Sequence, residues 1–117
     1  MLDAGSAVAA VDLDLELEAV AGEQVVAGEP MTGSAVLCTR GAGDIGAEEI
    51  GVWEMTPGSM RDVESDEVFV VIAGRATVRF DHDGTVLQLG PGTVGRLAAG
   101  QRTVWTVTET IRKVYIA

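Results

Sequence analysis

An unbroken alternation of apolar and acidic residues runs through VDLDLELE at residues 11–18. Successive side chains of a β-strand point to opposite faces, so this period of two predicts a half-buried strand. As a helix, the same segment would scatter its leucines over all sides. The side chains expected to face inward are Val11, Leu13, Leu15 and Leu17. We therefore expect an N-terminal arm or strand over residues 1–19.

From about residue 34 the chain consists of short apolar runs separated by turn residues. Glycine and proline punctuate it at 57–58, 73–74, 81–84, 90–92 and 98–100, and such clusters mark turns. The runs are rich in valine and threonine, and no helical stripe of apolar residues follows residue 20. Many short strands at this spacing are typical of a sandwich or a barrel. The predicted strands cover residues 34–39, 49–56, 67–73, 75–81, 85–89, 93–97, 103–108 and 110–117.

One motif imitates a nucleotide-binding loop. Residues 41–46 read GAGDIG, which fits the G-x-G-x-x-G spacing of a dinucleotide site. Such a site needs a helix that begins at the loop, so that its N-terminus meets the pyrophosphate. Here Gly51 and Pro57 interrupt the segment that follows, and Val52 and Trp53 favour a strand. We therefore interpret GAGDIG as a hairpin loop.

Composition and charge exclude several classes of function. The 117 residues suit a single domain, and 47% hydrophobic residues are ordinary for a globular protein. A formal net charge of −10 would repel phosphate backbones and anionic lipids, so we expect neither nucleic acid nor a membrane as partner. No apolar run approaches the ~18 residues that span a bilayer, and the first residues lack the positive segment of a signal peptide.

The single cysteine, Cys38, cannot form an internal disulfide, which agrees with a reducing compartment. We therefore expect a cytoplasmic protein. Cys38 lies in an apolar run with no base near it in the sequence, so we interpret it as a buried structural thiol.

Spaced motifs in the rest of the chain resemble those of the cupin family. In order they are Gly51, Trp53, Pro57 and Gly58; Glu67 and Gly74; Gly90, Pro91 and Gly92; Ala99 and Gly100; and Trp105. Over residues 20–117 the chain resembles small single-domain cupins grouped with ureidoglycine aminohydrolases and ethanolamine-utilisation proteins. The resemblance implies an all-β, RmlC-like cupin domain at 20–117, a double-stranded β-helix or jelly roll of two antiparallel sheets. It also implies a homodimer.

The resemblance further implies a metal site, but the chain lacks its histidines. Metal-using cupins supply two histidines and a glutamate from one motif and a third histidine later, ligands that suit Mn, Fe, Ni or Zn. Only the glutamate is kept, as Glu67; the only histidine, His82, lies in a predicted DHDG turn. The histidine positions fall on Met60 and Asp62 or on Arg61 and Val63, and near Gly95 or Thr103. We therefore expect no metal and no other cofactor, with a divalent metal as the less favoured alternative.

Four carboxylates gather before the predicted strand at 67–73, namely Asp62, Glu64, Asp66 and Glu67. Oxygen ligands suit Ca, Mg or Mn, yet clustered carboxylates repel one another unless a cation is bound. In an extended chain, Glu67 would face away from the other three. We expect Glu67 to face inward and interpret Asp62, Glu64 and Asp66 as a solvated rim, with a weak metal site or ligand contacts as alternatives.

The predicted binding residues share an inward position in their strands. A glutamate facing an apolar cavity needs a partner, and Arg96 is the candidate partner for Glu67. The alternative is that Arg96 faces solvent while Gly95 and Leu97 pack inward. The candidate ligand-binding residues are Trp53, Met55, Phe69, Arg96 and Trp105, of which the apolar ones could equally form only the core.

Three functions stay open on these grounds. The first is a cupin-domain protein without the usual metal-binding histidines that binds a small polar metabolite in the barrel. The second is an aminohydrolase-like enzyme acting on a ureide or amino compound, with Glu67 as catalytic acid or base. The third is a structural dimerisation module, in which the strand at 11–18 completes a neighbour's sheet.

Overall fold

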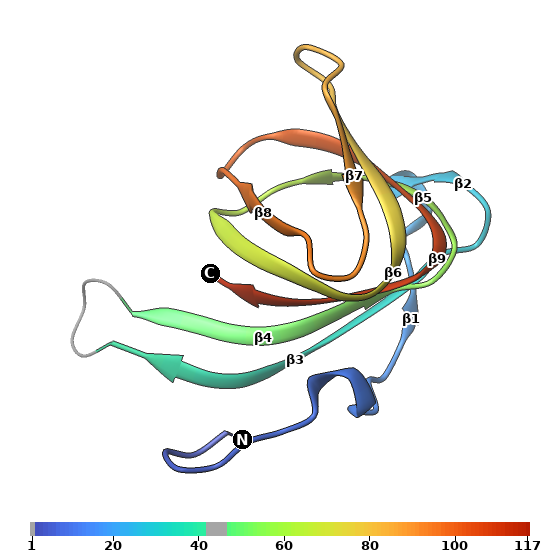
Figure 1. Ribbon diagram of the computed structural model, residues 1–117. Helices are drawn as coiled ribbons and strands as arrows, with labels where there is room; N and C mark the ends of the chain where they lie inside the picture. The colour runs from blue at the N-terminus through green and yellow to red at the C-terminus, as the bar shows by residue number, and fades with distance from the viewer. Residues whose placement is uncertain (1, 42–46) are drawn as a thin grey trace.

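The structure is a computed structural model that describes residues 2–41 and 47–117 (Figure 1). Strands dominate the described part, with two short 3₁₀ turns, η1 (Ala10–Asp12) and η2 (Gly22–Gln24). None of the helical segments in these two ranges is long and apolar enough to cross a membrane. The predicted hairpin loop GAGDIG lies outside the described residues, apart from Gly41.

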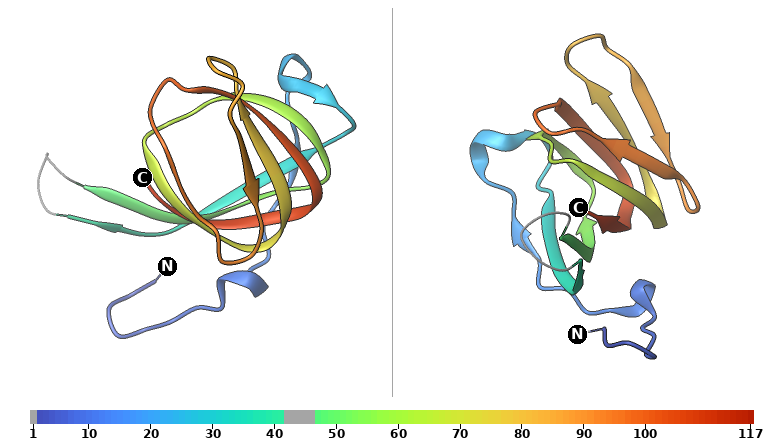
Figure 2. Two further views of the ribbon diagram at one scale, coloured as in Figure 1. Left: turned by 45° about the horizontal axis from the view of Figure 1, so that its top comes forward. Right: turned by 90° about the vertical axis from the view of Figure 1, so that its left-hand side faces the viewer.

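In the described residues, nine strands make one curled antiparallel sheet. In the order β1-β3-β4-β9-β5-β2, each strand pairs with the next, and β6 pairs with β7, β8 and β9. Figure 2 shows that the strands after β4 curl into a barrel, while β3 and β4 extend beyond it as a pair. This arrangement confirms the all-β prediction. The bounds are β1 (Glu18–Ala19), β2 (Val25–Ala27), β3 (Met31–Arg40), β4 (Glu48–Met55), β5 (Gly58–Val63), β6 (Glu67–Phe80), β7 (Val86–Leu89), β8 (Val94–Leu97) and β9 (Arg102–Ile116).

Strands β6 and β9 are each longer than the sequence pattern predicts. The strands expected at 67–73 and 75–81 form one strand, β6, and those at 103–108 and 110–117 form one strand, β9. The predicted turn at 73–74 is therefore wrong. Gly74 has a φ of +86°, and the pairing register shifts between Val71 and Ala76. Bulges of this kind bend a strand and increase its twist, so the β6–β9 pair continues around the barrel.

The hydrophobic core fills the inside of the barrel. Its side chains come from alternate positions of β4, β5, β6, β7, β8 and β9, as the pleat of a strand requires. Its largest fully buried members are Trp105, Phe69, Met55, Leu97 and Ile111. These residues include three of the five predicted ligand-binding side chains, so packing decides how much of the barrel stays open.

The N-terminal arm differs from the predicted strand. Within residues 2–19, strand pairing is confined to Glu18 and Ala19, which pair with β3, and Val11 lies in η1 with 53% of its surface exposed. The prediction of a strand across 11–18 with Val11 inward is therefore wrong. Leu13, Leu15 and Leu17 are half-buried while the acids between them are exposed, so the alternation of burial is as predicted for the leucines.

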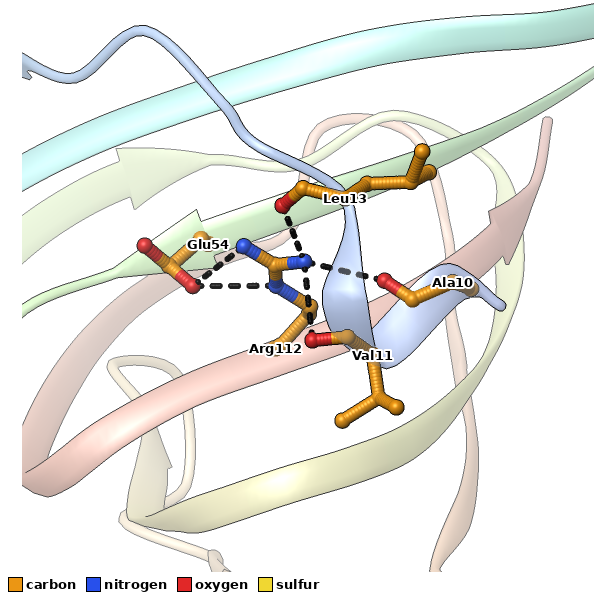
Figure 3. Close-up of polar contacts among 5 residues, drawn as sticks. All are labelled: Ala10, Val11, Leu13, Glu54 and Arg112. Carbon is orange, nitrogen blue, oxygen red and sulfur yellow. Dashed lines mark hydrogen bonds and ion pairs between the residues drawn. The ribbon is translucent and has the colours of Figure 1, made fainter. Parts of the chain in front are cut away.

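Arg112 attaches this arm to the face of the sheet that lies outside the barrel. Its Nε and Nη2 contact Glu54 Oε1 at 2.9 Å, and its Nη1 donates to the carbonyl oxygens of Ala10, Val11 and Leu13 (Figure 3). The side chain of Arg112 is only 10% exposed. A guanidinium presents several donors at fixed angles, so one side chain can satisfy the carbonyls left free at the end of η1.

Candidate functional site

A cavity of about 240 Å³ lies at the end of the barrel where β5 ends and β6 begins. A wider cleft of about 560 Å³, lined partly by Glu16 and by residues 18–21, shares Ser34, Trp53 and Asp62 with it. The two spaces therefore adjoin, and Asp62 belongs to the lining of both. The remaining lining of the inner cavity comprises Val63, Glu64, Ser65, Glu67, Trp105, Lys113 and Tyr115.

Glu67 is paired with Lys113 and not with Arg96. The Lys113 ammonium donates a hydrogen bond to Glu67 Oε1, and the two side chains are only 7% and 12% exposed, lysine first. Strand β9 runs between β4 and β6, so Lys113 has Trp53 and Val71 as its neighbours in register. The sequence signal for this residue was available, because Lys113 is the single lysine of the chain and interrupts an apolar strand.

Arg96 lies on the outside of the barrel. It is exposed on β8 opposite Val68, whereas Leu97 is fully buried. A Cβ placed on Gly95 would be 2.3 Å from the Phe69 ring, so Gly95 faces the core. The prediction that Arg96 enters the cavity as the partner of Glu67 is therefore wrong, and the alternative, with Gly95 and Leu97 inward, is the arrangement found. Strand alternation fixes this outcome once Leu97 is buried.

The clustered acids divide between the cavity and its rim. Asp62 belongs to β5 and lines the cavity, while Asp66 is exposed and accepts a hydrogen bond from the Ala99 backbone. Glu64 is buried, and its Oε2 accepts from Thr103 Oγ1 at 2.6 Å and from Trp105 Nε1 at 2.8 Å. The solvated-rim prediction is thus wrong for Glu64 and Asp62. The irregular backbone between β5 and β6 breaks the alternation, which lets Glu64 and Glu67 both face inward.

Asp62 is the acid whose charge this environment disfavours. Burial, followed by repulsion from Glu64, raises the pKa of Asp62 from an ordinary 3.8 to about 6. The hydrogen bond from the Val63 backbone and the Lys113 charge oppose this shift. Within residues 2–41 and 47–117, Asp62 takes part in no ion pair. The site therefore carries a carboxylate that lacks a cationic partner.

Replacing Asp62 with asparagine should stabilise the protein in a pH-dependent way. Because the folded state holds this proton more tightly than the unfolded state, ionisation costs stability as the pH rises from 3.8 to about 6. Above pH 6 the Asp62→Asn variant should exceed wild type by about 1 kcal/mol, allowing for solvent screening of this half-buried group. Urea unfolding between pH 4 and 8 measures the difference, which should shrink toward pH 4. A difference that is constant across this range would contradict the assignment.

The predicted aromatic residues are distributed between the cavity wall and the core. Trp53 is half-buried and lines both the cavity and the cleft, and Trp105 lines the cavity while only 1% exposed. Met55 and Phe69 are not among the cavity-lining residues and belong to the core, at 0% and 1% exposure. For Met55 and Phe69 the structure thus supports the core alternative. The Tyr115 hydroxyl donates to Glu49 at the same mouth, and burial followed by that contact raises its pKa to about 12.

The residues at this site do not suit a divalent metal. Glu67 is the one residue kept from the metal-ligand pattern, and its carboxylate already accepts a hydrogen bond from the Lys113 ammonium. Met60 packs in the core and Thr103 donates to Glu64. No group of three or more His, Cys, Asp or Glu side chains in the described ranges is placed to hold a metal ion.

His82 lies in the predicted turn, and its side chain is 68% exposed. Cys38 is half-buried, so it is less buried than the sequence predicted.

Comparison with known proteins places these features in context. The model of the EutQ-like cupin domain matches residues 42–115. A protein of unknown function of the DUF861 family from Pseudomonas syringae superposes with a TM-score of 0.73 at 24% identity, covering 90% of this chain but 44% of that one. The chain therefore spans less than half of that protein. Among proteins with curated descriptions, none matches the chain significantly.

Two EutQ structures also share the fold. A putative ethanolamine utilization protein Q from Salmonella typhimurium has a TM-score of 0.62 at 19% identity, covering 89% of this chain and 94% of its own. The EutQ protein of Clostridium difficile has a TM-score of 0.60 at 17% identity, with 74% and 67% covered. At such identities the likeness concerns the fold alone.

Proposed function

Since the chain belongs to the EutQ-like cupin domain family, with the jelly roll predicted for it, we propose that it binds a small polar amine beside Asp62. The observation that carries the proposal is the charge of the cavity. Asp62, Glu64 and Glu67 line it against one cation, Lys113, whose charge is taken by Glu67. A protonated amine on the ligand would supply the partner that Asp62 lacks.

The dimensions and remaining walls support a small ligand. Ligand pockets commonly enclose roughly 300–1,000 Å³, and this cavity of about 240 Å³ lies just below that range. Trp53 is half-buried and lines both the cavity and the cleft, and an aromatic ring attracts a cation. Ser34 and Tyr115 add hydroxyl groups for hydrogen bonding.

Three molecules of nearly equal size test the charge preference. They are ethanolamine, ethylene glycol and glycolate, which are cationic, neutral and anionic near pH 7.5. Ethanolamine is a suitable cation because one structural neighbour is described as a putative ethanolamine utilization protein. With so few atoms, each contributing at most about 1.5 kcal/mol, its Kd should lie in the range of tens of micromolar to millimolar. Calorimetry or NMR titration should rank ethanolamine first, with at least about tenfold weaker binding of the other two.

Two variants locate the binding site. Asp62→Asn should weaken ethanolamine binding about tenfold, the effect of losing one charge-assisted hydrogen bond. Asp66→Asn is the matched control, because Asp66 is exposed outside the cavity lining. Equal binding of the amine and ethylene glycol, or equal loss in both variants, would refute the proposal.

A second candidate function is enzymatic and is favoured by the pKa of Asp62. The aminohydrolase-like alternative assigned acid–base catalysis to Glu67, which is ion-paired with Lys113. A carboxylic acid with a pKa of about 6 at a cavity is better suited to transfer protons near neutral pH. Ammonia release from ureidoglycine that is lost in Asp62→Asn and kept in Glu67→Gln would support this role. No ammonia release from the wild type would reject it.

The homodimer also stays a proposal. Val68, Val70, Val94 and Ile116 are exposed on one face, where Val70 pairs with Val94 and Val68 with Ile116. Contiguous apolar surface of this kind is typical of interaction sites. Sedimentation of the full chain measures its mass, and a monomer at micromolar concentration would reject the dimer.

A further inference from the structure

The Lys113 ammonium lies inside a cage of three aromatic rings. Its Nζ is 4.8 Å from the ring centroids of Trp53, Phe69 and Trp105, which come from β4, β6 and β9. Trp105 is tilted by 59° to Trp53 and by 52° to Phe69, so the rings surround the cation instead of stacking on one another. A cation within about 6 Å of a ring face gains roughly 0.5–2 kcal/mol, more when water is excluded.

The Glu67 carboxylate completes the cage. It accepts the Lys113 hydrogen bond, and both side chains are nearly buried. A buried ion pair is favourable only when each charge is well compensated, and here the aromatic faces supply the rest of the ammonium's environment. The elements therefore form a complete recognition site for one alkylammonium ion.

The presence of lysine at position 113, and not arginine, agrees with this cage. Of the 8 basic residues in the chain, Lys113 alone is a lysine. A guanidinium is broad and planar, whereas an ammonium is a compact point charge. The cage thus contains the one basic side chain whose head group fits between three converging rings.

We infer that the interior of this barrel is an alkylammonium-binding site and that Lys113 supplies its ammonium from within the chain. The inference does not depend on the proposed amine ligand, which would lie outside the cage beside Asp62. It places a cation at the Glu67 carboxylate, the position that a metal ion bound by Glu67 would need. It also predicts that an external amine can replace the missing side chain.

Lys113→Ala tests the inference by chemical rescue. The variant loses the side chain beyond Cβ, and n-propylammonium has the same atoms as the part removed. n-Propylammonium should raise the folding equilibrium constant of the variant at least about tenfold more than the same concentration of 1-propanol does. Thermal or urea unfolding measures both effects. The wild type, whose cage is filled, should show no such difference. Equal effects of the amine and the alcohol on the variant, or equal rescue of the wild type, would overturn the inference.

A second pair of variants keeps the test decisive if Lys113→Ala does not fold. Lys113→Met preserves most of the side-chain volume but leaves the Glu67 charge buried and unpaired. Its folding equilibrium constant should fall about 100-fold or more, because losing one partner of a buried pair is strongly destabilising. Adding Glu67→Gln should recover at least about tenfold of that loss. Full stability of Lys113→Met, or no recovery in the double variant, would overturn the inference, whatever the outcome of the ethanolamine titration.

Discussion

Gly74→Ala should severely destabilise the folded protein. A Cβ at this position would lie 2.0 Å from the Thr110 carbonyl oxygen and 2.6 Å from the Ile111 Cα. Both contacts are with the backbone of β9, so no side-chain rotation can relieve them. The residue also has a φ of +86°, which costs an L-amino acid roughly 1–2 kcal/mol. We expect a total loss of about 4 kcal/mol or more, a large part of the typical stability of a domain.

A second glycine separates the two causes. Gly100 has the same φ of +86°, but a Cβ there would meet nothing within 4 Å. Gly100→Ala should therefore cost only the backbone term, about 1–2 kcal/mol. Circular dichroism and urea unfolding of both variants measure the difference. If the two variants lose equal stability, the close approach of β6 and β9 at Gly74 is not what requires glycine.

Trp105→Phe should be the most damaging conservative change at the cavity. The indole N–H of Trp105 donates to Glu64 Oε2 at 2.8 Å, and phenylalanine cannot replace it. Hydrogen bonds to charged groups contribute about 1.5–3 kcal/mol, and the smaller ring also leaves a void in a site that is 1% exposed. We expect a loss of about 2–4 kcal/mol in the free energy of unfolding, measured in urea.

The other tryptophan provides the matched control. Trp53 is half-buried, and no hydrogen bond from its indole occurs in the described part of the chain. Trp53→Phe should therefore cost about 1 kcal/mol or less. Comparable losses in the two variants would mean that the hydrogen bond to Glu64 contributes little. A cycle with Glu64→Gln then isolates the Trp105–Glu64 pair.

Local patterns were sufficient for much of the fold. Alternating runs located β4, β7 and β8 within a few residues, and the DHDG sequence placed His82 in an exposed turn. The ordered motifs from Gly51 to Trp105 led to the cupin family, which the domain match confirms. These features depend on side chains close together in sequence, where the pleat and turn chemistry act directly.

The site depended on contacts that no local pattern contains. Lys113 meets Glu67 across 46 positions of sequence, and Trp105 meets Glu64 across 41. These pairs arise because β9 lies beside β4 and β6 at Lys113 and beside β5 and β6 at Trp105. Similarly, Arg112 attaches η1 to the sheet, and the alternation of apolar and polar residues does not predict this contact.

The sequence by itself determined an all-β domain, its family, and the position of Glu67 at the start of a buried strand. Only the tertiary structure decided which charge meets Glu67, which acids face the cavity, and that Arg96 lies outside. The physical reason is that alternation assigns faces within one regular strand. It assigns none across the irregular segment between β5 and β6, and it does not say which strands become neighbours.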